Sequence, residues 1–268
     1  MSEAISEPGG SVLPRPMGVG EILSAAFRLY QRHWRTLLAI AAVVVVPITL
    51  LQYLLGNQVR SQSQVTSSGV VVSTPSWAVG ISGLVAALAG LLMYLVLTGA
   101  ITRAVAAEVA GEDPGLEQSY RFGFHRLGSV LLVSVLVGLA TLAGLILLVI
   151  PGIYIGVRLA VSIEALVVEG RRGTGSMSRS WQLVGGHWWH AFGTLLVAAL
   201  LTGLVNTLLT SPFGATNWVA QAVVAAVATT ITLPYGALVG VLLYLDLRAR
   251  KETLTLETLR TDLQASAA

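Results

Sequence analysis

The sequence predicts an all-α integral membrane protein with six transmembrane helices, arranged as three hairpins that are each preceded by a basic amphipathic interfacial helix. Of its 268 residues, 54% are hydrophobic and 11% are charged, whereas a soluble domain carries about 25% charged residues. Apolar runs recur that are long enough to cross a hydrocarbon core of about 30 Å. Arginine gathers at alternate connections between these runs, as it does on the cytoplasmic side of membrane proteins. Lipid is therefore the expected solvent for most of the chain.

The apolar runs divide the chain into a membrane domain and two tails. Residues 1–16 lack the apolar core of a signal peptide and are expected to be a disordered cytoplasmic tail. The membrane domain covers residues 17–251, and residues 252–268 are expected to be a second cytoplasmic tail. The predicted spans are residues 37–55, 79–101, 127–150, 153–170, 188–210 and 218–245.

Three basic, aromatic segments precede the three predicted hairpins. They are Met17–Arg35, Leu116–Arg126 and Arg171–His187, and each has a His near its end. The sequence FRLYQRHW at Phe27–Trp34 matches WQLVGGHW at Trp181–Trp188 at the first aromatic, the Leu, the His and the Trp. An internal repeat would explain this match, with each unit made of an interfacial helix, an outward span and a returning span. The shared demands of a membrane interface are the alternative explanation.

The distribution of basic residues predicts the orientation. Thirteen Arg and Lys residues fall on one set of connections, and Arg60 alone falls on the opposite set. The positive-inside rule then places both termini in the cytoplasm, with the protein in the inner (cytoplasmic) membrane of the cell. The thirteen are Arg15, Arg28, Arg32, Arg35, Arg103, Arg121, Arg126, Arg171, Arg172, Arg179, Arg248, Arg250 and Lys251.

The fourth predicted span contains three charged residues, Arg158, Glu164 and Glu169. Pro151-Gly152 is expected to make the turn before it. Helical periodicity places Arg158 and Glu169 on one face and turns Glu164 about 100–140° away. A charge in the core of a span costs about 2.5–3.5 kcal/mol, so a partner or water is expected. One hypothesis is a polar cavity for a lipid headgroup or ion, with Arg158 meeting phosphate. In the alternative, Arg158 reaches the outer headgroups and Glu169 the cytoplasmic edge.

Other charged and aromatic residues complete the candidate binding set. Asp246 is expected to pair with Arg250 one helical turn on, or alternatively with Arg103 or Arg158. Arg179 is a candidate contact for lipid phosphate. The interfacial anchors are expected to be Trp34, Trp181, Trp188 and Trp189.

No catalytic or metal-binding pattern is visible in the sequence. The chain has no Cys, and His33, His125 and His187 recur singly, without the Cys or carboxylate ligands typical of a metal site. A nucleotide-binding glycine loop and the usual hydrolase residue sets are also missing. We therefore expect no enzymatic activity, no cofactor, no metal and no nucleic-acid partner.

Several blocks of sequence resemble a known membrane family. PGIYIGVRL, then Glu169-Gly170, then SRSWQLVGGHWW, together with the opening RPMGVGEILSAAFRLYQRHWRTLL, resemble the membrane domain family of glycerophosphoryl diester phosphodiesterase. The resemblance covers most of Arg15–Leu247. It implies a stand-alone member that lacks the family's soluble catalytic domain, and it transfers no catalytic residue. The family usually has proline near Ile163 and Glu164, so the Glu implies a straighter and more polar fourth span here.

Three functions are compatible with these features. The first is an accessory or scaffold subunit that binds anionic lipid and another membrane or membrane-associated protein, with homo-oligomers left open. The second is a lipid or small-solute transporter with an intramembrane polar cavity, because internal repeats and intramembrane charges suit transporters. The third is the membrane part of a lipid phosphodiester enzyme that acts with a separate catalytic chain.

Overall fold

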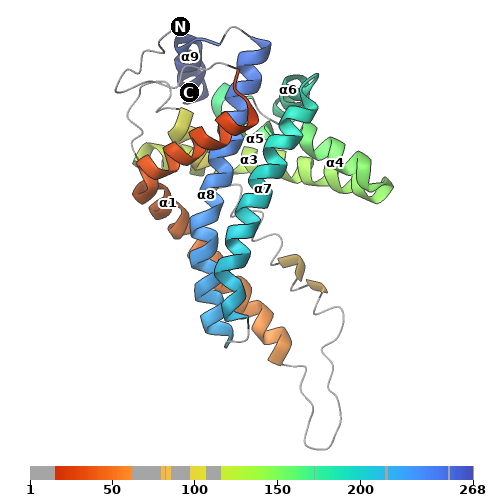
Figure 1. The fold of residues 1–268 in the computed structure, drawn as a ribbon. Coiled ribbons are helices and arrows are strands. Elements are labelled where there is room, and N and C mark those ends of the chain that lie inside the picture. Colours follow the sequence, from red (N-terminus) through yellow and green to blue (C-terminus); the bar gives the residue numbers. More distant parts are fainter. Residues whose placement is uncertain are drawn as a thin grey trace, which may run out of the picture.

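The computed structural model is all-helical wherever it is described, which confirms the predicted all-α class (Figure 1). Among the described residues, four helical segments are long and apolar enough to cross a membrane: Val19–Leu54, Val149–Glu169, Trp188–Phe213 and Trp218–Lys251. Six spans in three hairpins are not established, since most of predicted span 79–101 and residues 1–15 of the first tail lie outside the described residues. The described residues are 16–61, 80–81, 83–85, 97–106, 116–171, 173–214, 217–252 and 254–267.

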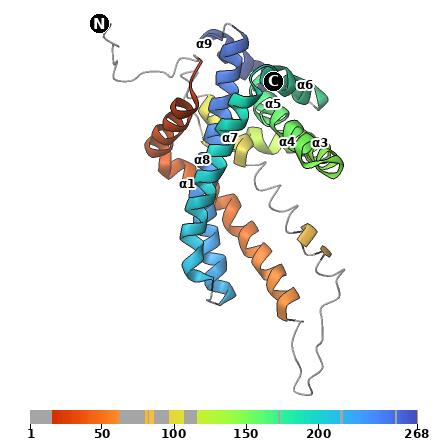
Figure 2. The same cartoon turned by 45° about the vertical axis from the view of Figure 1, so that its right-hand side comes forward.

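Helix α1 (Val19–Ser61) covers most of the segment predicted as the first interfacial helix and all of the first predicted span. At its start the Gly18 amide donates to the Glu21 carboxylate at 2.8 Å, which satisfies one free amide of the helix terminus. His33 has non-helical dihedral angles (φ −116°, ψ 21°), and α1 turns a corner in both views (Figures 1 and 2). The helix therefore changes direction close to the predicted end of the interfacial segment.

Helices α7 (Trp188–Thr210) and α8 (Trp218–Lys251) run antiparallel, and α1 packs along α8. A short 3-10 helix, η1 (Ser211–Phe213), connects them, and the Asn217 side chain caps α8 by accepting from the Ala220 amide at 2.9 Å. The outer face of α7 carries a leucine stripe at four-residue spacing. Leu200, Leu204 and Leu208 are 63%, 58% and 63% exposed. Such a large exposed apolar face suits contact with lipid.

Helices α3 (Leu116–Leu147) and α4 (Val149–Arg158) pack as a hairpin that projects sideways from α7 and α8 (Figures 1 and 2). The predicted turn at Pro151-Gly152 is wrong. The chain reverses at Leu148, which is extended. Pro151 lies in the first turn of α4, where backbone amides have no partner within the helix, so the missing N–H of proline costs no hydrogen bond. Gly152 instead packs against α3, because a Cβ on Gly144 would lie only 2.9 Å from the Gly152 Cα. Small residues allow such close helix contact.

The predicted straight fourth span is also wrong, because it is broken between α4 and α5 (Ser162–Glu169). Turn residues Leu159–Val161 separate the two helices. Ser180 of α6 (Thr174–Val184) supplies the missing bonds: its hydroxyl donates to the Arg158 carbonyl at 2.8 Å and accepts from the Val161 amide at 3.3 Å. Backbone polar groups freed by a helix break need such partners when they are buried.

The second expected tail, residues 252–268, contains a packed helix, α9 (Leu256–Ala267). Leu259 and Leu263 are fully buried, and α9 contacts α5. Arg103, in the helical segment 97–106, donates to the Leu263 carbonyl and to the Ser266 hydroxyl, both at 3.0 Å. A cation near the last carbonyls of a helix is favourable, so Arg103 helps to hold the C-terminal helix in place.

Candidate functional site: the charged end of the bundle

Helices α5, α6 and α9 lie at one end of the α1, α7 and α8 bundle (Figure 1). Charged side chains of α5, α6, α8 and α9 pair with one another at this end. The chain contains no Asp, Glu, Lys or Arg from Trp188 to Leu245. The apolar lengths of α7 and α8 therefore lead away from this charged end. All six candidate binding residues lie on elements that meet at or beside it.

Glu169 is the centre of a buried ion cluster at this end. Its side chain is 6% exposed. One carboxylate oxygen accepts from Arg179 Nε and from the Tyr244 hydroxyl, both at 2.8 Å. The other accepts from Arg171 Nε at 2.7 Å, and Arg248 Nε lies 3.7 Å from the first oxygen. Glu169 is thus held by groups from two other helices and a loop, and does not extend to a free edge.

The Glu169 cluster extends to α9, and its acidic and basic side chains are equal in number. Arg248 Nη1 donates to Asp262 Oδ2 at 2.9 Å, and Arg179 Nη2 pairs with Glu252 Oε1 at 2.5 Å. Burial lowers the pKa of Arg179, but the carboxylates of Glu169 and Glu252 outweigh it and leave that pKa raised. Arg179, a candidate for lipid phosphate, is therefore already engaged by two acids. The members are three acids and three arginines with one tyrosine: Glu169, Glu252, Asp262, Arg171, Arg179, Arg248 and Tyr244.

Asp246 forms a second, separate network. It is fully buried and accepts from the Met17 amide at 2.6 Å, from Arg250 Nε at 2.8 Å and shares a hydrogen bond with His190 Nε2 at 2.9 Å. Arg250 Nη2 also donates to the Met17 carbonyl at 2.6 Å. The expected pairing with Arg250 is present. Asp246 therefore ties the start of α1 to α7 and α8.

Arg158 lies among aromatic rings at the junction of α4, α6 and α7. Its Nε and Nη2 donate to the Tyr154 hydroxyl at 3.0 and 2.7 Å, and Nη1 donates to the Trp181 carbonyl at 2.9 Å. The guanidinium carbon is 5.2 Å from the Tyr154 ring centre and 4.9 Å from that of Trp181. Arg158 thus turns toward α6, not toward the far end of α4. The break after α4 also separates it from Glu169, with which it was expected to share a helix face.

Glu164 is the candidate residue whose carboxylate is not fully engaged. It is 3% exposed, and its Oε2 has no hydrogen-bond partner in the described part of the chain. Its Oε1 lies against α8, where a Cβ on Gly240 would come within 2.8 Å. For Oε2, the expected partner is thus not seen among the described residues.

Three of the expected Trp anchors, Trp181, Trp188 and Trp189, lie beside the charged end, whereas Trp34 follows Tyr30 of α1, which bonds to Ile231 further along α8. Trp34 is 47%, Trp181 41% and Trp189 77% exposed, while Trp188 is half-buried. Arg35 lies over the Trp34 ring at 5.3 Å. These positions suit the headgroup region of a membrane.

Two of the three recurring histidines have almost the same backbone conformation. His33 has φ −116°, ψ 21°, and His187 has φ −123°, ψ 24°. Each stands where an amphipathic helix meets an apolar one. Burial, with Arg250 and Lys251 nearby, lowers the pKa of His187. No group of three or more metal-binding side chains occurs among the described residues.

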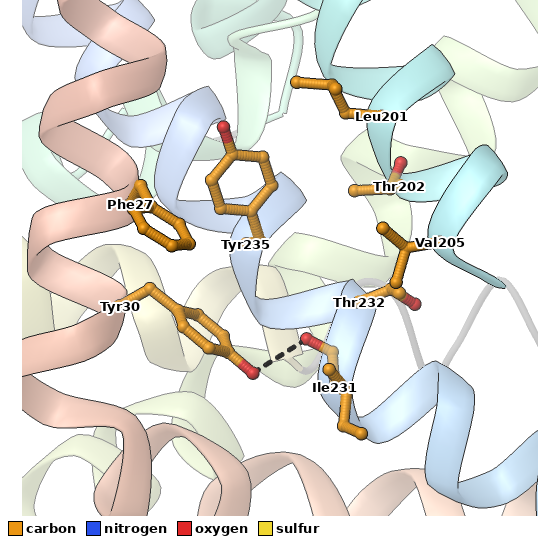
Figure 3. Close-up of a pocket in the computed structure, with 8 residues that line it drawn as sticks. All are labelled: Phe27, Tyr30, Leu201, Thr202, Val205, Ile231, Thr232 and Tyr235. Carbon is orange, nitrogen blue, oxygen red and sulfur yellow. Dashed lines mark hydrogen bonds between the residues drawn. The ribbon is translucent and has the colours of Figure 1, made fainter. Parts of the chain in front are cut away.

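An apolar groove of about 260 Å³ lies between α1, α7 and α8 (Figure 3). The Tyr30 hydroxyl donates to the Ile231 carbonyl at 2.9 Å, close to Pro234, which disturbs the hydrogen bonding of α8. None of the lining residues is an acid, Lys, Arg or His. They are Phe27, Tyr30, Leu201, Thr202, Val205, Ile231, Thr232 and Tyr235.

Several residues of this end were not singled out from the sequence. Ser180, His190, Tyr244, Arg248 and Asp262 all bond to helices distant in sequence. The four-residue spacing from Tyr244 to Arg248 and from Arg248 to Glu252 was the available signal for part of this set. Nothing in the sequence indicated that Glu169 joins them.

Comparison with protein-family models, curated proteins and solved structures finds no match to this chain.

Proposed function

We propose that this chain is a multi-pass inner-membrane protein without catalytic machinery, an accessory or scaffold subunit that binds anionic lipid and a protein partner. Both termini and the charged end face the cytoplasm in this proposal. The observation that supports it best is a set of exposed arginines on α1 that have no acidic partner among the described residues: Arg28, Arg32 and Arg35.

The arginines of α1 differ from those of the ion networks. Arg179, Arg248 and Arg250 are each paired with carboxylates. Arg28, Arg32 and Arg35 are exposed, while Ile22 and Ala26 of the same helix are fully buried. An amphipathic helix with basic residues on its open side is typical of a membrane interface. Each such cation near an anionic leaflet contributes about 1 kcal/mol of attraction.

The sequence resemblance agrees with this proposal. A stand-alone member of the phosphodiesterase membrane-domain family would have membrane helices and interfacial segments but no catalytic site. The outer leucine stripe of α7 offers a face for lipid, another membrane protein or a second copy. If a phosphodiesterase chain co-purified in fixed ratio, the role as membrane part of a two-chain enzyme would replace the scaffold role.

The α1 arginines can be tested together. In the Arg28→Gln, Arg32→Gln, Arg35→Gln triple variant, we expect phosphatidylglycerol to raise the Tm by about 5–10 °C less than in the unaltered protein. Three lost attractions of about 1 kcal/mol each give this size. The measurement is thermal unfolding in detergent with added phosphatidylglycerol or phosphatidylcholine.

Arg171→Gln is the matched control. Arg171 is also exposed, at 51%, but its Nε pairs with Glu169, so the lipid-dependent shift should stay close to that of the unaltered protein. A triple variant that responds to phosphatidylglycerol as strongly as this control would contradict the lipid-binding role of α1.

Transport is the second candidate, and Glu164 is the observation that favours it. A buried carboxyl with an unpartnered oxygen inside a membrane is a functional-site hypothesis. If the protein carries protons, proteoliposomes with a trapped pH-sensitive dye should show a proton flux that Glu164→Gln abolishes and Glu257→Gln, on the exposed surface of α9, preserves. A flux no greater than that of protein-free liposomes would reject proton-coupled transport.

A further inference from the structure

We propose that Arg158 and the aromatic side chains around it bind the phosphodiester group of one membrane phospholipid. The Arg158 site consists of Arg158, Tyr154, Trp181, Trp188 and Trp189. It lies where α4, α6 and α7 meet, away from the groove and from the arginines of α1.

The hydrogen bonds of Arg158 leave donors available. A guanidinium has five N–H groups, and three are used, by the Tyr154 hydroxyl twice and by the Trp181 carbonyl once. One N–H therefore remains on each terminal nitrogen. No carboxylate of the described chain lies within ion-pair distance of Arg158. Two N–H groups on neighbouring nitrogens suit the paired oxygens of a phosphate.

The guanidinium is held in place before any ligand arrives. The Tyr154 and Trp181 rings both lie against it, and Ser180 fixes the Arg158 backbone carbonyl. Gly185 leaves room for it, because a Cβ there would lie 3.0 Å from Nη1. Little side-chain entropy then remains to be lost on binding, which favours affinity.

A second cation, Lys251, lies beside the turn between α6 and α7. The Lys251 Nζ lies 4.0 Å from the position that a Cβ on Gly186 would occupy, and Gly186 has φ +80°, a conformation that glycine adopts readily. Lys251 is exposed and has no acidic partner among the described residues. The α6–α7 turn therefore carries positive charge on both sides, which favours an anionic group.

The exposed rings indicate a lipid as the source of that group. Trp188 stacks on Tyr154 at 5.8 Å and on Phe192 at 5.0 Å, and the Trp189 ring lies nearly perpendicular to that of Trp188 at 4.7 Å. Tyr154 is 39% and Trp189 77% exposed. In water this apolar ring surface would remain exposed to solvent. A phospholipid can cover the rings with its acyl chains and bind the guanidinium through its phosphate.

The inference rests on the proposed function only in that it places the chain in a phospholipid bilayer. The α1 arginines respond to the net charge of the lipid, while the Arg158 site needs the phosphate. Phosphatidylethanolamine, which has no net charge, should therefore also occupy it.

The test is native mass spectrometry of the full chain titrated with phosphatidylethanolamine or phosphatidylglycerol. We expect one tightly bound phospholipid per chain. Its affinity should fall on the order of 10- to 100-fold in Arg158→Gln. The loss should be smaller in Arg158→Lys, because lysine keeps the positive charge but lacks the paired N–H groups of the guanidinium. Arg171→Gln is the matched control, because Arg171 is also partly open to the surroundings, at 51%, but pairs with Glu169 outside the Arg158 site. Its phosphatidylethanolamine affinity should be unchanged.

A second readout does not depend on removing the arginine. Brominated phosphatidylethanolamine should quench the tryptophan fluorescence of the unaltered protein saturably, and Trp189→Leu should reduce the quenched fraction. Equal affinity in the unaltered protein and Arg158→Gln, with quenching unchanged in Trp189→Leu, would overturn the proposal. Displacement of the bound lipid by millimolar inorganic phosphate would also overturn it, since the site would then select a free anion. A failed α1 triple-variant test would leave the phosphatidylethanolamine result unaffected.

Discussion

Glu169→Ala is expected to lower the free energy of unfolding by about 3–5 kcal/mol, the usual result of removing one partner from a buried ion pair. Glu169 is 6% exposed and accepts from Arg179, Tyr244 and Arg171. Without it, Arg248 and Arg179 keep their charges at a mostly buried junction of α5, α6, α8 and α9. Equilibrium unfolding in a mixed-detergent titration measures the loss.

Arg171→Ala provides the comparison for Glu169. It removes one contact of the same carboxylate from the exposed side, and exposed ion pairs are worth about 0–1 kcal/mol. If Glu169→Ala costs no more than Arg171→Ala, the Glu169 cluster does not hold these helices together.

Asp246→Ala is the second substitution with a large expected effect, again about 3–5 kcal/mol. Asp246 is fully buried, and its loss leaves the Met17 amide and Arg250 Nε without their acceptor. Because Met17 lies 229 residues from Asp246 in sequence, the start of α1 should also lose its attachment. Equilibrium unfolding gives the total effect, and hydrogen exchange at the amides of Met17 and Ile22 should show the local release.

His190→Gln separates the parts of the Asp246 network. Glutamine can still donate a hydrogen bond to Asp246, and a hydrogen bond to a charged group contributes about 1.5–3 kcal/mol. We expect a loss of that size or less, with the exchange at Met17 unchanged. Unaltered exchange at Met17 in Asp246→Ala would show that another contact fixes the start of α1.

The features that the sequence predicted well depend on local spacing. Low charge and long apolar runs indicate a membrane protein, and the four apolar helical segments agree with this. The pair Asp246 and Arg250 follows from four-residue spacing on one helix. The change of direction near His33 follows from the point at which basic, amphipathic sequence gives way to an apolar run.

The features that the sequence did not predict depend on contacts between distant segments. The break after Arg158 occurs without proline and is supported by Ser180 of another helix. Gly152 reads as a turn residue until its contact with Gly144 is known. Glu169 could be placed on a helix face, but its partners come from α6, α8 and a loop, and no periodicity on a single helix reveals such a convergence.

The most direct test of the proposed lipid-binding role is the lipid that co-purifies with the unaltered protein in mild detergent. Mass spectrometry of that lipid, compared with the bulk membrane from the same cells, should show an enriched share of anionic phospholipid. The enrichment should fall in the Arg28→Gln, Arg32→Gln, Arg35→Gln variant. A co-purified lipid composition equal to that of the bulk membrane, and equal in the two proteins, would contradict the role.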